Sequence, residues 1–248
     1  MESQNRPQLS DILQGLQLLT RLPLPAGTQP IRPAAAWAWP LAGAVVTGFS
    51  LCAAGLALPA GPGIAAGVAL CAQAMLTGAM HEDGLADSAD GLWGGWDRGR
   101  RLDIMKDSHI GTYGVLALLL SCLIRWVALT ALIAAGQWFA LIAVGAASRA
   151  SIAVAMALLP NARGSGLSQS VGHPPFWSAA LAVMIGVLAL LVSTGWAGLA
   201  AILAIVLASA IVAGLARAKI GGQTGDILGA IQQVSEAVAL SVLTALAV

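Results

Sequence analysis

Charged side chains are scarce in this sequence of 248 residues. Aspartate, glutamate, lysine and arginine make up 9% of it and hydrophobic residues 58%, whereas a soluble domain carries roughly 25% charged residues. So few charges cannot cover the surface of a soluble protein of this length. The deficit indicates an all-α, polytopic integral membrane protein, in which apolar helices face lipid.

Cysteine and net charge are also low, and each absence removes a class of function. The three cysteines, Cys52, Cys71 and Cys122, lie in apolar segments without the spacing of a metal site, so we expect small buried hydrophobic residues. The net charge of +1 gives no overall field that would favour nucleic acid. The first apolar span begins only after residue 33, too late for a cleavable signal peptide.

Long apolar segments are plentiful instead, each close to the ~20 residues that span a bilayer. Seven are predicted, at about 34–58, 62–80, 112–134, 138–159, 176–194, 196–216 and 227–247. A short amphipathic helix is predicted over 8–21, either flat in the membrane interface or packed on the loops. We therefore expect an N-terminal arm, 1–33, and one transmembrane catalytic domain, 34–248.

Positive charges lie in every second connection between the predicted spans. Ten of the 12 lysines and arginines lie in the N-terminal arm and in the connections after the second, fourth and sixth spans. The positive-inside rule makes that side cytoplasmic. Seven spans then place the N-terminus and the polar loop 81–113 in the cytoplasm and the C-terminus outside.

Acidic residues gather in that loop, which holds seven of the 11 carboxylates. They are Glu82, Asp83, Asp87, Asp90, Asp97, Asp103 and Asp107. Like charges so close together repel, and the repulsion grows near a membrane, where the dielectric constant falls. Oxygen ligands without cysteine or paired histidine suit a hard divalent cation, Mg²⁺ or Mn²⁺. A solvated acidic surface is the alternative.

Helical spacing arranges these acids in two groups. If 81–92 continues the second span as a helix, Asp83, Asp87 and Asp90 share one face of it. Asp103 and Asp107 repeat the i, i+4 pair on a next helical piece that would lead into the third span. Glycines separate the two pieces and let the backbone turn so that they face each other. These glycines are Gly91, Gly94, Gly95 and Gly99.

A carboxylate-bound metal beside positive charges suits transfer between phosphate groups. The loop supplies such charges, unless they only determine topology: Arg98, Arg100, Arg101 and Lys106. The Asp-x-x-Asp-Gly run at Asp87–Gly91, followed by Asp103 and Asp107, is similar to CDP-alcohol phosphotransferases, with shorter spacing and no Ala-Arg pair. A secondary transporter is the other alternative. Transporters keep ionisable groups near the bilayer midplane, where this chain has three, Arg125, Arg149 and Glu236.

Longer motifs occur along the whole chain. They are Leu19–Pro25 (LTRLPLP), His81–Gly91 (HEDGLADSADG), Ile104–Ser108 (IMKDS), Ile110–Val115 (IGTYGV), Ser148-Arg149, Pro160–Arg163 (PNAR), Gly166-Leu167 and Gly221–Ala230 (GGQTGDILGA). In combination they resemble the cobalamin-5′-phosphate synthase (adenosylcobinamide-GDP ribazoletransferase) family.

This resemblance implies a reaction and its setting. A ribose hydroxyl of α-ribazole, or of its 5′-phosphate, attacks adenosylcobinamide-GDP at the phosphate on the corrinoid side. GMP leaves, and adenosylcobalamin or its 5′-phosphate forms. The setting is the bacterial cytoplasmic (inner) membrane, with the active loop facing the cytoplasm. We expect the bilayer and the two substrates as partners and no nucleic acid. A homo-oligomer, or a complex with other cobalamin-assembly enzymes, is left open.

The roles of individual residues are hypotheses. The expected metal ligands are Glu82, Asp83, Asp87, Asp90 and Asp107. The expected catalytic residues are Asp83, Asp87, Asp90, Asp103, Lys106 and Asp107. Asp103 would be a further ligand or the general base, and Lys106 a phosphate contact. The expected substrate-binding residues are His81, Arg149, Arg163 and Asp226. The alternative for Asp226 is capping of the seventh helix, and the alternative for His81 is a structural role. For Arg125, a pair with Glu236 and a contact with the substrate are both left open.

Overall fold

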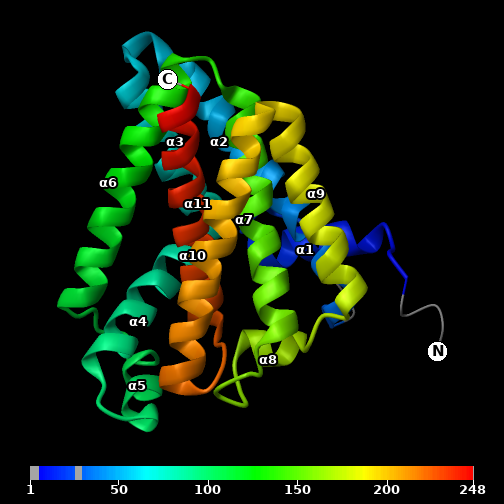
Figure 1. Ribbon diagram of the computed structural model, residues 1–248, viewed down its shortest axis with the longest axis vertical. Helices are drawn as coiled ribbons and strands as arrows, with labels where there is room; N and C mark the ends of the chain where they lie inside the picture. Colours follow the sequence, from blue (N-terminus) through cyan, green and yellow to red (C-terminus); the bar gives the residue numbers. More distant parts are fainter. Residues whose placement is uncertain (1–5, 26–29, 248) are drawn as a thin grey trace.

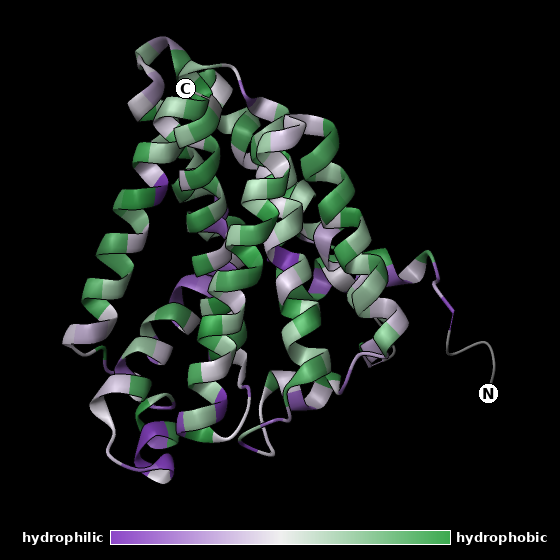
Figure 2. Ribbon diagram, in the orientation of Figure 1, coloured by the Kyte–Doolittle hydropathy of each residue, from purple (hydrophilic) through white to green (hydrophobic). Residues whose placement is uncertain are grey.

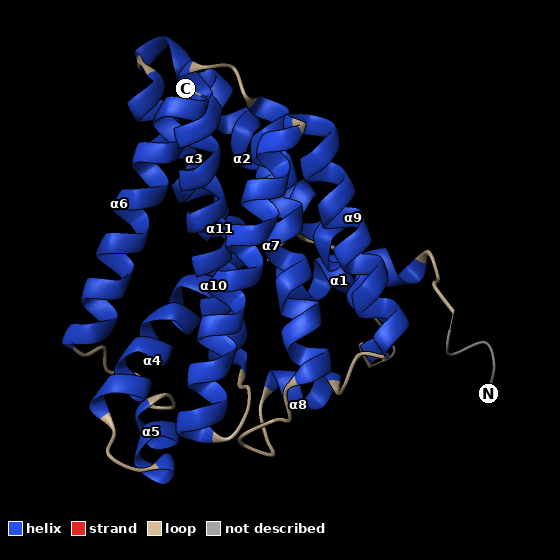
Figure 3. Ribbon diagram, in the orientation of Figure 1, coloured by secondary structure: helices blue, strands red, loops and turns tan. Residues whose placement is uncertain are grey.

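The computed structural model describes residues 6–25 and 30–247, and this part of the chain is helical apart from loops and one isolated bridge, Asn161 to Gln223 (Figures 1 and 3). Its helices are α1 (Ser10–Leu19), η2 (Pro33–Ala38), α2 (Trp39–Ala57), η3 (Leu58–Ala60), α3 (Pro62–Thr77), α4 (Met80–Gly94), α5 (Arg98–Ile104), α6 (Thr112–Ala134), α7 (Trp138–Leu158), α8 (Leu167–Val171), α9 (Phe176–Thr194), α10 (Trp196–Ile220) and α11 (Gly225–Ala247). The predicted all-α class is confirmed.

Six helical segments in the described ranges are long and apolar enough to cross a membrane. The pair α3 and α4 would make a seventh span, but the two helices are bent by 88°. The chain is thus a multi-pass membrane protein with six or seven candidate spans. The other six predicted segments match observed helices to within a few residues.

The bend between α3 and α4 corrects one prediction. The predicted shared face of Asp83, Asp87 and Asp90 assumed that 81–92 continues the second span as a helix, but α3 ends at Thr77. Gly78 and Ala79 both have positive φ angles, 66° and 55°. Such angles end a helix, and glycine adopts them readily. The acid-bearing helix α4 therefore begins a new direction at Met80 (Figure 1).

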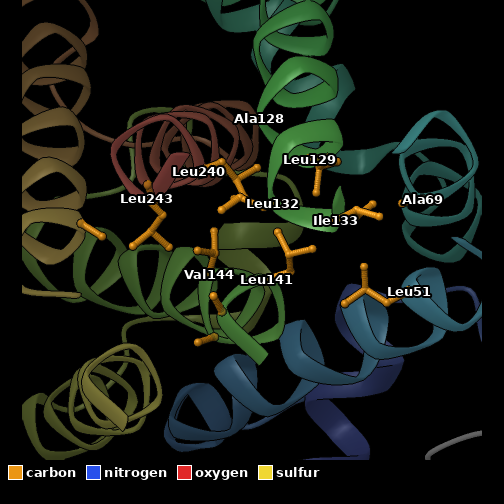
Figure 4. Close-up of a cluster of buried hydrophobic side chains, with 14 of the residues drawn as sticks. Leu51, Ala69, Ala128, Leu129, Leu132, Ile133, Leu141, Val144, Leu240 and Leu243 are labelled. Atoms are coloured by element: carbon orange, nitrogen blue, oxygen red, sulfur yellow. The ribbon is translucent and has the colours of Figure 1, made fainter. Parts of the chain in front are cut away.

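Helices α7 and α11 form the centre of the bundle. The candidate span of α7 is 78% buried and that of α11 72%, whereas α6, α9 and α10 are 17–28% buried. The core around them is built from leucine, isoleucine and valine with many alanines (Figure 4). Small residues let helices approach closely in a membrane. A Cβ atom at Gly43 of α2, for example, would collide with the carbonyl oxygen of Gly145 in α7.

The outer faces of α6, α9 and α10 are apolar and exposed, as lipid-facing helices require (Figure 2). This explains why a second prediction is wrong. Cys52, Cys71 and Cys122 are exposed rather than buried. In a membrane protein, an apolar segment has one face against the core and another against lipid, so apolar surroundings in sequence do not imply burial.

The predicted N-terminal helix is confirmed as α1. It packs against η2 and α2, and the fully buried carboxylate of Asp11 holds it there. One oxygen of Asp11 accepts from Arg32 Nη1 at 2.8 Å, and the other accepts from Trp37 Nε1 at 2.8 Å. These bonds attach α1 to the segment that leads into the first span.

Candidate active site

The acid-bearing helix α4 crosses the start of α11 at two glycines. A Cβ atom at Gly84 would lie 2.8 Å from the Asp226 carbonyl oxygen and 3.2 Å from the Gly229 Cα atom. A Cβ atom at Gly229 would lie 3.2 Å from the Cα atom of His81. The two backbones therefore touch, and only glycine permits this approach. The crossing joins residues from the middle and the end of the chain.

Three carboxylates gather at this crossing, and we call Asp83, Asp87 and Asp226 the acidic face. Asp83 is exposed, while Asp87 and Asp226 are half-buried. Asp87 experiences the negative charges of Asp83, Asp226 and Asp90 and the positive charge of Arg163. Arg163 Nη2 lies 2.8 Å from Asp226 Oδ2. A single guanidinium thus faces three carboxylates, which leaves the acidic face short of positive charge.

Asp226 does not cap α11. Thr224 does so, because its Oγ1 accepts a hydrogen bond from the Ile227 N–H at 3.3 Å. Thr224 Oγ1 also donates to Asp226 Oδ2 at 3.2 Å, which orients the carboxylate. With capping done by its neighbour, Asp226 is left to face Arg163 and α4.

Asp90 has a different environment from the acidic face. It is 8% exposed, and its oxygens accept hydrogen bonds from the backbone N–H groups of Gly111, at 2.7 Å, and Gly114, at 2.9 Å. These donors belong to the first turn of α6, which leaves N–H groups without intrahelical partners. Asp90 therefore caps α6 from another helix and fixes α4 to it.

Glu82 also lies away from the acidic face. Its Oε1 atom lies 3.3 Å from Arg125 Nη1 and accepts a hydrogen bond from Gln233 Nε2 at 3.0 Å. Neighbouring residues on a helix point about 100° apart at 3.6 residues per turn. The side chain of Glu82 therefore enters the bundle while that of Asp83 faces outward.

The second predicted group of acids is not formed as expected. Helix α5 ends at Ile104, so Asp103 and Asp107 do not share a helix. Just beyond that end, the buried side chain of Met105 lies so close to α4 that a Cβ atom at Gly91 would collide with it. The glycine-rich turn does bring the two pieces together, as predicted. Asp103, Lys106 and Asp107 are all exposed.

Asp107 pairs with a histidine instead of with the other acids. Its Oδ1 atom lies 2.6 Å from His109 Nδ1. The hydrogen bond from His109 lowers the pKa of Asp107, and the same bond raises the pKa of His109. Within the described residues, no three histidine, cysteine, aspartate or glutamate side chains are close enough to hold a metal ion together. The predicted five-ligand set is therefore not assembled.

Two of the arginines predicted to neutralise phosphates, Arg98 and Arg101, donate to backbone carbonyl oxygens. Arg98 donates to the carbonyl oxygens of Ile220, at 2.8 Å, and Ala162, at 2.6 Å. Arg101 Nη1 donates to the carbonyl oxygen of Lys219 at 3.1 Å. Lys219 in turn donates to the Leu92 carbonyl oxygen and lies over the Trp93 ring. These bonds connect α4, α5 and the C-terminal end of α10, so they position the loop.

The charges inside the spans form a separate group, which we call the buried charge network: Glu82, Arg125, Arg149 and Glu236. Arg125 Nη2 and Arg149 Nη1 each lie 2.9 Å from an oxygen of Glu236. Of the two roles left open for Arg125, the structure shows the pair with Glu236. Sequence reasoning missed the amides that complete the network, although glutamines within apolar spans were a visible signal. These are Gln73, Gln232 and Gln233.

The acidic face fits a hard divalent cation by its chemistry. It offers carboxylate oxygens, and its negative charge exceeds the positive charge of Arg163. Mg²⁺ keeps several of its waters and binds proteins through one or two carboxylates together with substrate phosphates. Asp83 and Asp87 on adjacent turns of α4 meet that need without a three-ligand protein site.

The chain is similar to a family model and to curated bacterial proteins over most of its length. The cobalamin-5-phosphate synthase family model matches residues 11–244. The adenosylcobinamide-GDP ribazoletransferase of Bradyrhizobium diazoefficiens is 48% identical over 85% of this chain and 83% of its own. The enzyme of the same name from Mesorhizobium japonicum is 44% identical over 96% of this chain and 93% of its own. The one from Brucella ovis is 42% identical over 94% of this chain and 95% of its own. No solved structure matches the chain.

Proposed function

The chain belongs to the cobalamin-5-phosphate synthase family, and we propose that its reaction takes place on the acidic face. It is an enzyme of cobalamin biosynthesis, an adenosylcobinamide-GDP ribazoletransferase. The observation that supports this location is the charge imbalance at the crossing of α4 and α11, where three carboxylates face one arginine. The crossing also joins the motifs His81–Gly91 and Gly221–Ala230.

The transfer exchanges a phosphoanhydride bond for a phosphate ester bond. A ribose hydroxyl of α-ribazole, or of its 5′-phosphate, attacks the corrinoid-side phosphorus of adenosylcobinamide-GDP. A new oxygen–phosphorus bond forms, the bond to the bridging oxygen breaks, and GMP leaves. The hydroxyl proton passes to a carboxylate of the acidic face that does not hold the metal. Bound Mg²⁺ supplies positive charge that neutralises the pyrophosphate and polarises the phosphorus.

Each residue of the acidic face then has a role. Asp83 and Asp87 hold Mg²⁺. Arg163 moves from Asp226 to the pyrophosphate, since a guanidinium binds phosphate oxygens in a bidentate manner. Lys106, exposed beyond the end of α5, contacts the outer part of the nucleotide. Asp90 and Glu82 act on the site by fixing α4 to α6 and to the buried charge network.

The orientation in the membrane is part of the proposal. Helix α4, which carries two of the acidic-face residues, lies with α5 and α8 at the same end of the bundle (Figure 1). That end also carries Arg98, Arg100, Arg101 and Lys106, and the positive-inside rule favours the cytoplasm for it. We assign it to the cytoplasmic side of the bacterial inner membrane, where nucleotide-activated substrates would reach it.

A release assay on purified protein in lipid nanodiscs tests the function. We expect GMP to form from adenosylcobinamide-GDP and α-ribazole with Mg²⁺ and not with excess chelator. Release of CMP from a CDP-lipid, with no GMP release, would instead support the CDP-alcohol phosphotransferase alternative. Turnover that is unchanged by removal of all divalent cations would overturn the metal assignment and leave the transfer reaction standing.

A further inference from the structure

A cavity of about 60 Å³ lies behind the acidic face, between α1, α2, α4, α7, α8 and α11. A single water molecule needs roughly 10–15 Å³ measured in this way, so the cavity accommodates a larger group. The side chains around it are mostly apolar. They include Leu19, Trp39, Met80, Ile152, Met156 and Val171.

Two side chains in the lining have polar atoms without a partner among the described residues: Nε1 of Trp39 and both ring nitrogens of His81. His81 is 2% exposed, and neither Nδ1 nor Nε2 has a hydrogen-bond partner among the residues that the structure describes. The nearby charges of Arg149, Glu236 and Arg125 are engaged with one another. Buried polar groups without partners are rare and costly in folded proteins. An imidazole left unpaired beside a cavity therefore points to a ligand that completes its hydrogen bonds.

The cavity reaches the acidic face at Gly225. This glycine lines the cavity and is exposed, and a Cβ atom there would meet no atom within 4 Å. The next residue is Asp226. On another part of the rim, Leu167 is 53% exposed. A group held in the cavity can therefore remain joined to a part of the same molecule that lies among the carboxylates.

We propose that this cavity binds the aromatic base of the ribazole substrate, with His81 donating a hydrogen bond to a ring nitrogen of that base. The inference rests on the proposed function, in which the ribose hydroxyl must lie at the acidic face. A flat heteroaromatic ring suits a lining of tryptophan and methionine, which stack on rings and adapt to their shape. A corrinoid is far too large for 60 Å³, and no lysine or arginine among the lining residues would bind a phosphate.

A pair of small inhibitors tests the hydrogen bond. 1-Methylbenzimidazole and 1-methylindole have nearly the same shape, but only the first carries an acceptor nitrogen in its five-membered ring. We expect 1-methylbenzimidazole to compete with α-ribazole about tenfold more strongly than 1-methylindole, the usual effect of one buried hydrogen bond. In His81→Phe this difference should disappear. KM for α-ribazole should rise roughly tenfold, with KM for adenosylcobinamide-GDP unchanged.

Two further variants keep the test decisive. His173→Phe makes the same substitution at an exposed histidine outside the lining and should change none of these values. Leu167→Trp narrows the exposed rim and should weaken both inhibitors without disturbing the core. If His81→Phe fails to fold, comparing the two inhibitors on the wild type and on Leu167→Trp still shows whether the cavity binds the base through an acceptor nitrogen.

Equal inhibition by both compounds in the wild type, or inhibition that does not compete with α-ribazole, would overturn the inference. The proposed function survives that outcome if GMP release continues. If GMP release itself is absent, the proposed function fails, and binding of 1-methylbenzimidazole, followed through tryptophan fluorescence of the wild type and His81→Phe, still tests the cavity.

Discussion

Helix α11 carries two carboxylates whose surroundings differ in kind. Glu236 lies deep in the bundle and receives Arg125, Arg149 and a hydrogen bond from Gln232 Nε2 at 2.6 Å. Asp226 lies at the end of the same helix, shares Arg163 with Asp87, and experiences the negative charge of Asp83. The buried charge network is balanced and fully bonded at Glu236, whereas the acidic face has an excess of negative charge.

This difference separates structural from functional charge. Charged groups within a membrane are costly unless they are paired, and the buried charge network meets that requirement using the chain's own residues. The acidic face does not, so an external cation and a phosphate-bearing substrate would complete it. Removing a charge from the network should therefore harm the fold, and removing one from the acidic face should harm catalysis alone.

The largest expected effect is on catalysis. Asp87→Asn should lower kcat for GMP release on the order of 10³-fold, as loss of a group that stabilises transition-state charge does. Its unfolding temperature should stay near the wild-type value, because a like charge has been removed. Asp97→Asn is the matched control, since asparagine caps a helix as well as aspartate does and Asp97 caps α5. A kcat for Asp87→Asn within threefold of the wild-type value would show that the active site lies elsewhere.

Glu236→Gln should destabilise the fold, whereas Asp87→Asn should lower catalysis and leave the fold intact. Two buried arginines would lose their shared carboxylate, and removal of one partner from a buried ion pair costs about 3–5 kcal/mol. We expect a loss of that size in the free energy of unfolding, measured by denaturant titration in mixed micelles. The double variant Glu236→Gln with Arg149→Gln should recover part of it. A loss below about 1 kcal/mol would show that the network is not structural.

Gly84→Ala tests the contact that assembles the acidic face. The added Cβ atom would lie 2.8 Å from the Asp226 carbonyl oxygen, so α4 must move away from α11. Overpacking of this kind costs about 1–3 kcal/mol, and a shift near 1 Å can lower activity about 10²-fold. Gly48→Ala in α2 is the control, because its Cβ atom meets nothing within 4 Å. Equal behaviour of the two variants would refute the close crossing.

Much of the fold follows from sequence because span length and apolar composition are local properties. The bend at Gly78 and Ala79 does not, since apolar residues continue through it and only the backbone angles show it. The residues predicted to hold the metal do not all lie together in the structure. Glu82 and Asp83 are neighbours in sequence, yet one joins the buried charge network and the other the acidic face. That separation depends on which side of α4 meets α11, and sequence spacing alone does not supply it.

The smallest expected effect concerns Asp107 and His109, an exposed ion pair that belongs neither to the acidic face nor to the buried charge network. The pKa of His109 is raised from 6.5 and that of Asp107 is lowered from 3.8 by their hydrogen bond. Any stability it adds is therefore full below pH 6.5, while Asp107 stays ionised, and is lost as pH rises through the raised pKa of His109. Both side chains are exposed, so His109→Gln should leave the unfolding temperature nearly unchanged between pH 5 and 8.

The Mg²⁺ concentration for half-maximal GMP release by His109→Gln should also stay within about twofold of the wild-type value, because an exposed pair outside the acidic face contributes little energy. A tenfold change that appears only above the His109 pKa would instead place Asp107 among the metal ligands, and the functional charges would then include the segment that follows α5.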